Sequence, residues 1–165
     1  YYKAVLWAVE NGITNGADAT HFNPMGVCNR AQVVTFLWSA AGKPEPTLTE
    51  NPYSDITEAD YFYKSVLWAH ENGITTGVGG GCFGPDLTAN RAQIVTFLWQ
   101  AKEQPEAGAD NPFVDVAESD YYYRPVLWAA QNGVTSGVDA DHFGPLNECT
   151  RAQVVTFLYK AYTAY

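Results

Sequence analysis

Residues 29–38 read NRAQVVTFLW, and nearly the same ten letters return as NRAQIVTFLW at 90–99 and as TRAQVVTFLY at 150–159. A second motif precedes each of them: KAVLWAVENGITNG from residue 3, KSVLWAHENGITTG from 64 and RPVLWAAQNGVTSG from 124. Self-similarity at a fixed period of about 60 residues is typical of a chain built from repeated supersecondary units. The sequence therefore predicts three repeats, which we place at residues 1–48, 49–108 and 109–165.

Each repeat is predicted to hold two helices joined by a loop. The second helix opens on a good N-cap residue, and a glutamine follows three positions later, which is the spacing of a capping box. These pairs are Asn29 with Gln32, Asn90 with Gln93, and Thr150 with Gln153. An Asn-Gly pair ends each first helix, because glycine readily takes the left-handed conformation after a helix. We expect helices near 1–11, 61–72 and 121–132, and near 29–42, 90–102 and 150–163.

Two short helices cannot bury this much apolar surface alone. The run Val-Val-Thr-Phe-Leu-Trp that follows the first cap is too apolar for a helix with one face in water. Neighbouring repeats must therefore cover one another. Neither terminal repeat carries a polar variant at its apolar positions, so we expect an all-α fold in which the three helix-loop-helix repeats close around a pseudo-three-fold axis.

Composition excludes several classes of function. A formal net charge of −9 argues against nucleic acid as a partner, because phosphate binding needs a basic surface. No apolar run approaches the roughly 20 residues of a membrane span, so no membrane insertion is expected. Three cysteines form no CxxC pair. We expect Cys28 and Cys149, at equivalent positions, to be held apart by the closure and to form no disulfide.

The first repeat begins late relative to the other two. Residues 51–56 (NPYSDI) and 111–116 (NPFVDV) form a preface to the second and third repeats, whereas residue 1 aligns with Phe62 and Tyr122. We interpret the first repeat as N-terminally truncated, lacking about eleven residues in this alignment.

The ordered motifs resemble those of a known family. An aromatic-x-Asp-Ile/Val preface, Trp-Ala-x-x-Asn-Gly-Ile/Val-x-x-Gly, Phe-x-Pro and then Arg-Ala-Gln are similar to the S-layer homology domain, which normally occurs in three tandem copies. The resemblance implies a pseudo-three-fold bundle with a central three-helix core. It also implies anchoring to a secondary cell-wall polysaccharide, commonly pyruvylated, in grooves between repeats at the extracellular bacterial surface. The family's Thr-Arg-Ala-Glu signature maps onto residues 150–153, with Gln153 in place of glutamate.

Three arginines are the leading ligand-binding candidates: Arg30, Arg91 and Arg151. Each takes the first helical position, where free backbone amides and the helix dipole attract anions. A guanidinium adds a planar fork that suits a carboxylate such as a pyruvate ketal. The alternative is that each arginine pairs with an acidic neighbour, such as Asp55, Asp115 or Glu148, and braces the loop.

A second candidate site pairs a base with a tryptophan. The bases Lys3, Lys64 and Arg124 precede Trp7, Trp68 and Trp128 by four residues, hence on one helix face. A cation beside an indole could form a sugar platform; alternatively, the stem of each base covers a core tryptophan. The full set of candidate ligand-binding residues is Arg30, Arg91, Arg151, Gln32, Gln93, Gln153, Lys3, Lys64, Arg124, Trp7, Trp68, Trp128, Asp55 and Asp115.

Metal binding and catalysis are not expected. Residues 139–142 (DADH) and 18–21 (DATH) contain metal-ligand types, but the second repeat has GGGC there, so turn formation is favoured. The histidines occupy no motif with a nucleophile, and the carboxylate pairs precede helices, where acids favour the dipole. We therefore predict no enzyme activity, no cofactor and no metal.

Cell-wall anchoring is accordingly the predicted function, and a structural, self-assembling or partner-binding repeat without sugar binding is the alternative. Lateral self-association remains open under either. Because the first repeat lacks the preface, we expect unequal grooves, with Arg91 and Arg151 contributing more to wall binding than Arg30.

Overall fold

The computed structural model describes residues 1–163, and the last two residues of the predicted third repeat lie outside this range. The described helices are α1 (Tyr2–Glu10), α2 (Arg30–Ala40), α3 (Tyr63–Glu71), α4 (Arg91–Ala101), α5 (Tyr123–Gln131) and α6 (Arg151–Thr163). Within residues 1–163 the extended pairing is limited to isolated bridges, so the all-α prediction is confirmed. Over the same range, no helix has both the length and the apolar character that crossing a membrane would require.

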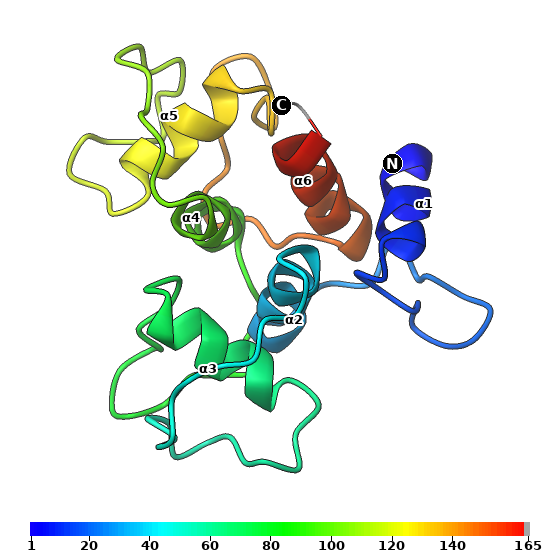
Figure 1. Ribbon diagram of the computed structural model, residues 1–165. Coiled ribbons are helices and arrows are strands. Elements are labelled where there is room, and N and C mark those ends of the chain that lie inside the picture. Colours follow the sequence, from blue (N-terminus) through cyan, green and yellow to red (C-terminus); the bar gives the residue numbers. More distant parts are fainter. Residues whose placement is uncertain (164–165) are drawn as a thin grey trace.

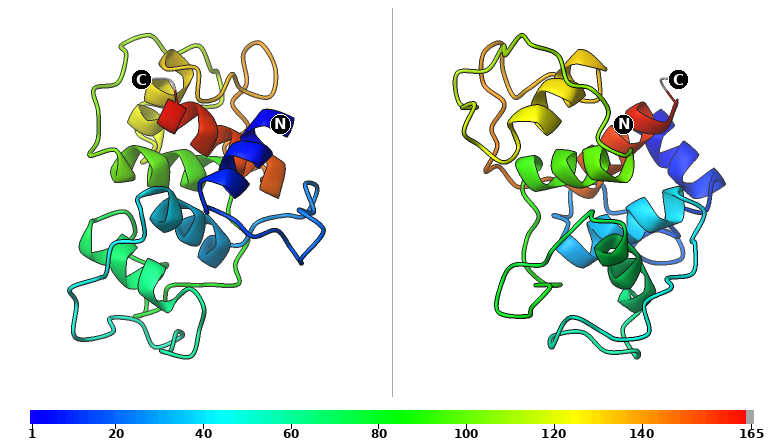
Figure 2. Two further views of the ribbon diagram at one scale, coloured as in Figure 1. Left: turned by 45° about the vertical axis from the view of Figure 1, so that its right-hand side comes forward. Right: turned by 60° about the vertical axis from the view of Figure 1, so that its left-hand side comes forward.

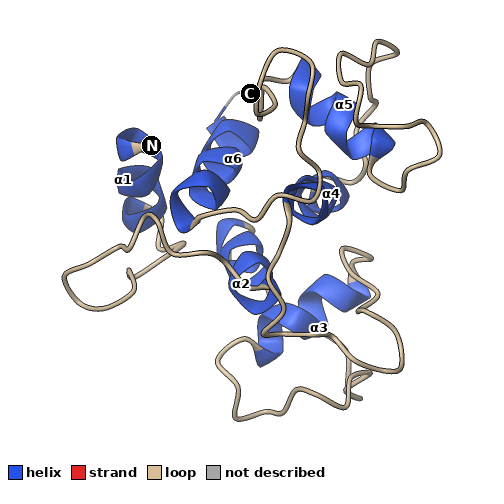
Figure 3. Cartoon of the chain, turned by 180° about the vertical axis from the view of Figure 1, so that it is seen from behind, coloured by secondary structure: helices blue, strands red, loops and turns tan. Residues whose placement is uncertain are grey.

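The second helix of each repeat lies at the centre. Helices α2, α4 and α6 contact one another around a common axis, seen from the front in Figure 1 and from behind in Figure 3. Each is apolar on most of its surface, and Val33, Val34 and Leu37 of α2 are at most 1% exposed. A helix that is apolar on most of its surface buries that surface against other helices, which explains the predicted central three-helix bundle.

The outer helices cross between repeats. Helix α3 packs on α2 and α5 packs on α4, while α1 packs on α6, so the first and last helices lie side by side (Figures 1 and 2). Each first helix therefore covers the second helix of the preceding repeat, and the α1–α6 contact closes the ring. The predicted pseudo-three-fold closure is confirmed, whereas the repeat boundaries at 48/49 and 108/109 stay predictions.

Helix α1 is less covered than its two counterparts. Leu6 is 42% exposed, but the equivalent Leu67 and Leu127 are 4% and 2% exposed. Only Ala4 and Ala8 of α1 are buried. The three outer helices share a sequence motif but not a common degree of burial.

A ring of backbone pairing surrounds the axis just before the central helices. The Cys28 N–H donates to the Cys149 carbonyl over 3.0 Å, and the Ala89 N–H donates to the Cys28 carbonyl over 3.1 Å. Cys28 and Cys149 are thus neighbours, and the expectation that closure would separate them is wrong. Both side chains are fully buried free thiols. Equivalent positions meet because they lie at the axis itself.

Candidate functional site

Capping boxes open all three central helices, as predicted. The Asn29 side chain accepts from the Gln32 N–H over 2.8 Å, while Gln32 Oε1 accepts from the Asn29 N–H over 3.1 Å. Asn90 with Gln93 repeats this arrangement, and Thr150 with Gln153 shows the same two bonds with a longer 3.4 Å contact to the hydroxyl. The cap glutamines therefore order the helix starts, and each keeps its NH₂ group for other partners.

The backbone amides at these helix starts are already occupied. The Arg30 N–H donates to the Leu87 carbonyl over 2.9 Å, and the Ala31 N–H donates to the Pro85 carbonyl over 3.1 Å. The equivalent amides of α4 and α6 are bonded in the same way to loops of the next repeats. The expectation of free amides that attract an anion is therefore wrong, because these amides donate to carbonyls of the adjoining repeat when the three repeats close.

Arg30 is a buried brace between repeats. Its Nε donates to the Phe83 carbonyl over 3.0 Å and its Nη2 donates to Thr75 Oγ1 over 3.3 Å. The guanidinium carbon lies 4.9 Å from the Phe83 ring centre and 5.3 Å from that of Phe97. Arg30 is 3% exposed, and this burial lowers its pKa. Two of its three guanidinium nitrogens are fixed, so the group is held in one orientation.

The other two arginines repeat the brace. Arg91 Nε donates to the Phe143 carbonyl over 2.9 Å, and Arg151 Nε donates to the Phe22 carbonyl over 2.8 Å. Their Nη2 atoms reach the hydroxyls of Thr135 at 3.0 Å and Thr14 at 3.4 Å. The alternative that each arginine braces a loop is therefore confirmed. Its predicted partners were wrong, because the arginines bond to neutral carbonyls and hydroxyls of another repeat rather than to acidic neighbours.

Asp55 and Asp115 hold the same loops from the other side. The Asp55 carboxylate accepts from the N–H groups of Phe83 and Gly84 over 2.8 and 2.7 Å. Asp115 accepts from Phe143 and the glycine after it, each over 2.8 Å. The peptide at Phe83 is thus clamped between an aspartate at its N–H and Arg30 at its carbonyl. The suggestion that these aspartates pair directly with the arginines is corrected.

The Ile/Val-Thr-x-Gly motif has a structural reason. Thr75 Oγ1 accepts from the Gly77 N–H over 3.1 Å as well as from Arg30. Gly77 has φ +85°, and a Cβ there would collide with the Cys82 carbonyl oxygen and lie 2.7 Å from the Tyr53 ring. Only glycine fits this turn. The motif therefore positions the threonine hydroxyl that accepts the hydrogen bond from the arginine of the preceding repeat.

A groove opens beside Arg30. The Arg30 groove has a volume of about 450 Å³ and is lined by Arg30, loop 73–78, the α4 residues Gln93, Thr96, Phe97 and Gln100, and Tyr121. It draws on all three repeats. The Nη1 atom of Arg30 takes no part in the brace, so this edge of the guanidinium is the one that the groove can offer to a ligand.

An equivalent groove of about 520 Å³ lies beside Arg151 and includes Gln32, Trp38 and Tyr61. Its loop belongs to the first repeat, which has no counterpart of Asp55 among residues 1–163. The sequence-based ranking assigned the incomplete groove to Arg30. The structure corrects that premise, because Arg30 meets the loop of the second repeat, which Asp55 holds, and Arg151 meets the loop of the first repeat.

The tryptophans of the second candidate site are mostly core residues. Trp68 and Trp128 are 7% and 2% exposed, so their ring faces cannot serve as sugar platforms. Trp7 is half-buried and packs edge-on against Tyr159, with ring centres 5.6 Å apart. Both rings belong to the hydrophobic core, as the packing of α3 on α2 and of α5 on α4 requires.

The bases of that site remain at the surface. Lys64 forms a 2.7 Å ion pair with Glu45 across the linker. Lys3 is exposed on α1, and Arg124 is exposed at the edge of a pocket beside the second linker. A ligand role for these bases stays a prediction.

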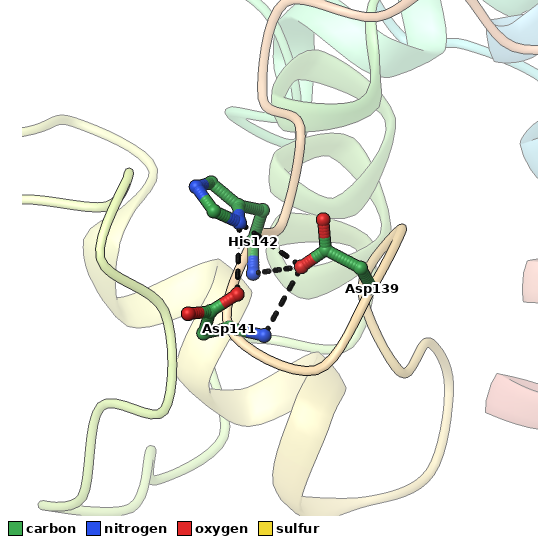
Figure 4. Close-up of side chains that lie close together, drawn as sticks. All are labelled: Asp139, Asp141 and His142. Carbon is green, nitrogen blue, oxygen red and sulfur yellow. Dashed lines mark hydrogen bonds and ion pairs between the residues drawn. The ribbon is translucent and has the colours of Figure 1, made fainter.

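The acidic turn of the third repeat gathers Asp139, Asp141 and His142 (Figure 4). His142 Nδ1 lies 3.0 Å from Asp139 and 2.9 Å from Asp141. Asp139 also accepts from the backbone N–H groups of Asp141 and His142, and these bonds hold its pKa below the usual range. Asp139, in turn, raises the pKa of His142. These bonds within an exposed turn account for its geometry, and the absence of a metal stays a prediction.

Sequence reasoning missed three kinds of site residue. Thr75, Phe83 and their equivalents receive the arginines, and Tyr61 and Tyr121 line the grooves while 67% and 65% exposed. Their signal was present, because the Thr recurs in each Asn-Gly-Ile/Val-Thr motif and the tyrosine recurs after Asp in two repeats.

Known proteins share these repeats. The model of one family, the S-layer homology domain, matches residues 1–34, 52–95 and 112–155. The Surface-layer 125 kDa protein of Lysinibacillus sphaericus is 33% identical over 62% of this chain and 9% of its own length. The Surface layer protein of Brevibacillus choshinensis is 31% identical over 59% of the chain and 9% of its own length. An Endoglucanase of Bacillus sp. (strain KSM-635) is 24% identical over 67% and 12% respectively. The chain thus spans only about a tenth of these relatives.

Proposed function

Because the chain belongs to the S-layer homology domain family, whose modules anchor proteins non-catalytically to the cell wall, we propose that it binds a pyruvylated secondary cell-wall polysaccharide in the grooves beside its buried arginines. The family and the surface-protein relatives place the chain at the cell surface, in association with the cell wall. The finer claim concerns the ligand and its site.

The observation that carries the proposal is the fixed guanidinium at the wall of the Arg30 groove. Its Nε and Nη2 atoms are bonded to the neighbouring repeat, so the remaining edge needs no ordering when a ligand binds. Carboxylates are the preferred partners of such an edge. The Gln93 amide and the Tyr121 ring line the same groove and suit the hydroxyls and the C–H face of a sugar.

Charge supports a local rather than a general attraction. The chain carries a net charge of −9, so an anionic polymer is not drawn to it at long range. Salt screens exposed charges beyond roughly 8–10 Å, and a buried arginine in a groove is screened less. Specific binding in the groove is therefore the mode that the charges permit.

The test adds one carboxylate to the groove without touching the brace. Gln100→Glu lies in the last turn of α4 and lines the Arg30 groove, and Gln131→Glu makes the same change in the last turn of α5, outside it. Repulsion between two carboxylates about 6 Å apart at an effective dielectric of 20 is on the order of 1–3 kcal/mol before screening. Gln100→Glu should weaken binding to the wall polysaccharide about ten-fold, and Gln131→Glu should not.

Binding is measured by co-sedimentation with purified cell walls before and after removal of their polysaccharide with hydrofluoric acid. If the unchanged protein does not sediment with intact walls, or sediments equally with stripped walls, the proposal is wrong. Self-association without sugar binding is the alternative function. It would appear as concentration-dependent sedimentation of the protein alone.

A further inference from the structure

Two pockets outside the arginine grooves lie where the linkers cross the outer helices. The first linker pocket, about 520 Å³, lies between segment 46–49, the turn before α3, and α3 itself. The second, about 720 Å³, lies between segment 104–109, the turn before α5, and α5. Each linker is tied down by a tryptophan of the central helix: Trp38 Nε1 donates to the Pro44 carbonyl and Trp99 Nε1 to the Pro105 carbonyl, both over 2.8 Å. The pockets are therefore equivalent and built, rather than accidental gaps.

Each linker pocket adjoins an arginine groove across one exposed tyrosine. Tyr121 lines both the Arg30 groove and the second linker pocket. Tyr61 lines both the Arg151 groove and the first linker pocket, and Trp38 is shared there too. The two tyrosines are 65% and 67% exposed, so a chain-like ligand can contact groove, ring and pocket in succession.

The linker pockets differ from the grooves in charge. The second pocket has three carboxylates, from Glu106, Glu118 and Asp120, against the single guanidinium of Arg124. In the first pocket the ammonium of Lys64 is already paired with Glu45. An acidic sugar would be repelled by this excess of carboxylates, whereas an uncharged one would not.

The walls suit an uncharged hexose. Carboxylates accept strong hydrogen bonds from hydroxyl groups, and Glu118 is exposed in the second pocket. Asp120 is less available, because it accepts from the Ala117 N–H over 2.7 Å and so shapes the turn. The faces of Tyr121 and Tyr123 offer electron-rich surfaces for the apolar C–H face of a sugar ring.

We propose that each linker pocket is a second subsite, which binds an uncharged hexose of the same polysaccharide whose carboxylate-bearing sugar occupies the neighbouring arginine groove. This inference rests on the proposed function. The module then binds two sugars of different charge, one on either side of a tyrosine. The carboxylates of the linker pocket favour the uncharged sugar over the acidic one at that subsite.

Two variants test the second pocket. Glu118→Ala removes a hydrogen-bond acceptor and Ala109→Trp fills the pocket; both positions are exposed, and Glu10→Ala on α1 is the control. The probe is polysaccharide released from cell walls by hydrofluoric acid and immobilised for biosensor measurement. Glu118→Ala should weaken binding roughly ten-fold or more, the range expected for one hydrogen bond to a charged acceptor. Ala109→Trp should weaken it at least as much, and Glu10→Ala should leave it unchanged.

A second probe separates this inference from the proposed function. Mild acid removes the ketal-linked pyruvate and leaves the polymer uncharged at that sugar. The fold-change caused by Glu118→Ala should be the same on both polymers, and the effect of Gln100→Glu should disappear on the stripped one. If both pocket variants bind the intact polymer like the unchanged protein, the second subsite is refuted and wall binding in the groove stands. If Glu118→Ala acts only on the pyruvylated polymer, the pocket binds the acidic sugar and the inference is equally overturned. If the unchanged protein does not bind the intact polymer, the proposed function fails first.

Discussion

Replacing Arg30 by alanine should destabilise the fold, because the residue joins two repeats. The hydrogen bond from its charged Nε to the Phe83 carbonyl contributes about 1.5–3 kcal/mol, and the longer bond to Thr75 about 0.5–1 kcal/mol. Contact with two phenylalanine rings contributes a further ~0.5–1 kcal/mol. Relief from burying the charge, visible as a lowered pKa of Arg30, offsets part of this sum. We expect a net loss of about 2–4 kcal/mol.

The assay is urea unfolding followed by tryptophan fluorescence. With a denaturant slope of about 2 kcal/mol per molar urea, Arg30→Ala should lower the midpoint by roughly 1–2 M. Lys64→Ala is the matched control, since it removes a basic side chain that is 56% exposed and forms only a surface ion pair. Its cost should stay below about 1 kcal/mol. If the two variants unfold at the same midpoint, the arginine is not a brace. Loss of wall binding in Arg30→Ala has to be read against this destabilisation.

Three further outcomes are expected. Asp55→Ala frees two backbone N–H groups and should cost about 2–4 kcal/mol in the same urea assay, whereas Asp86→Ala at an exposed loop position should cost less than about 0.5 kcal/mol. Burial raises the pKa of Cys28 to about 12, so the native state keeps a proton that the unfolded chain releases above about pH 9. On account of this thiol, the free energy of unfolding should therefore fall by about 1.4 kcal/mol per pH unit from roughly pH 9 to 12. Cys28→Ala, which introduces the residue found at the equivalent position Ala89, should remove this contribution to the slope. An unchanged slope would contradict the raised pKa of Cys28. With a thiol-reactive dye at neutral pH, half-buried Cys82 should react first, and the buried thiols of Cys28 and Cys149 should react only at the rate of unfolding. Three equal reaction rates would mean that the axis between the central helices is open to solvent.

The local features of the fold were readable from the sequence. The 60-residue period, the capping boxes at Asn29 and Asn90, and the glycines after the outer helices depend on neighbours within a few positions, and all are present. Closure was predictable as well, because no repeat carries a polar face in place of its apolar one. The arginines could be named as candidate site residues, because an arginine recurs at the first helical position of all three repeats.

The partners of those arginines could not be read in this way. Arg30 meets Thr75 across 45 residues, and Arg151 meets Thr14 across 137. Which loop an arginine reaches depends on the direction in which the repeats follow one another around the axis, and a periodic sequence is compatible with either direction. The sequence-based ranking therefore assigned the loop of the first repeat to the wrong arginine.

Burial of repeated positions was likewise decided by tertiary packing. Leu6 and Leu67 stand in the same motif, yet one is 42% exposed and the other 4%, because a linker crosses α3. Cys28 and Cys149 are neighbours because equivalent positions at a rotation axis converge, whereas equivalent positions farther out diverge. The sequence by itself determined the helices, their caps and the number of repeats, since these depend on local backbone chemistry. Only the three-dimensional closure decided which surfaces became grooves, because a groove is formed by residues that meet from different repeats.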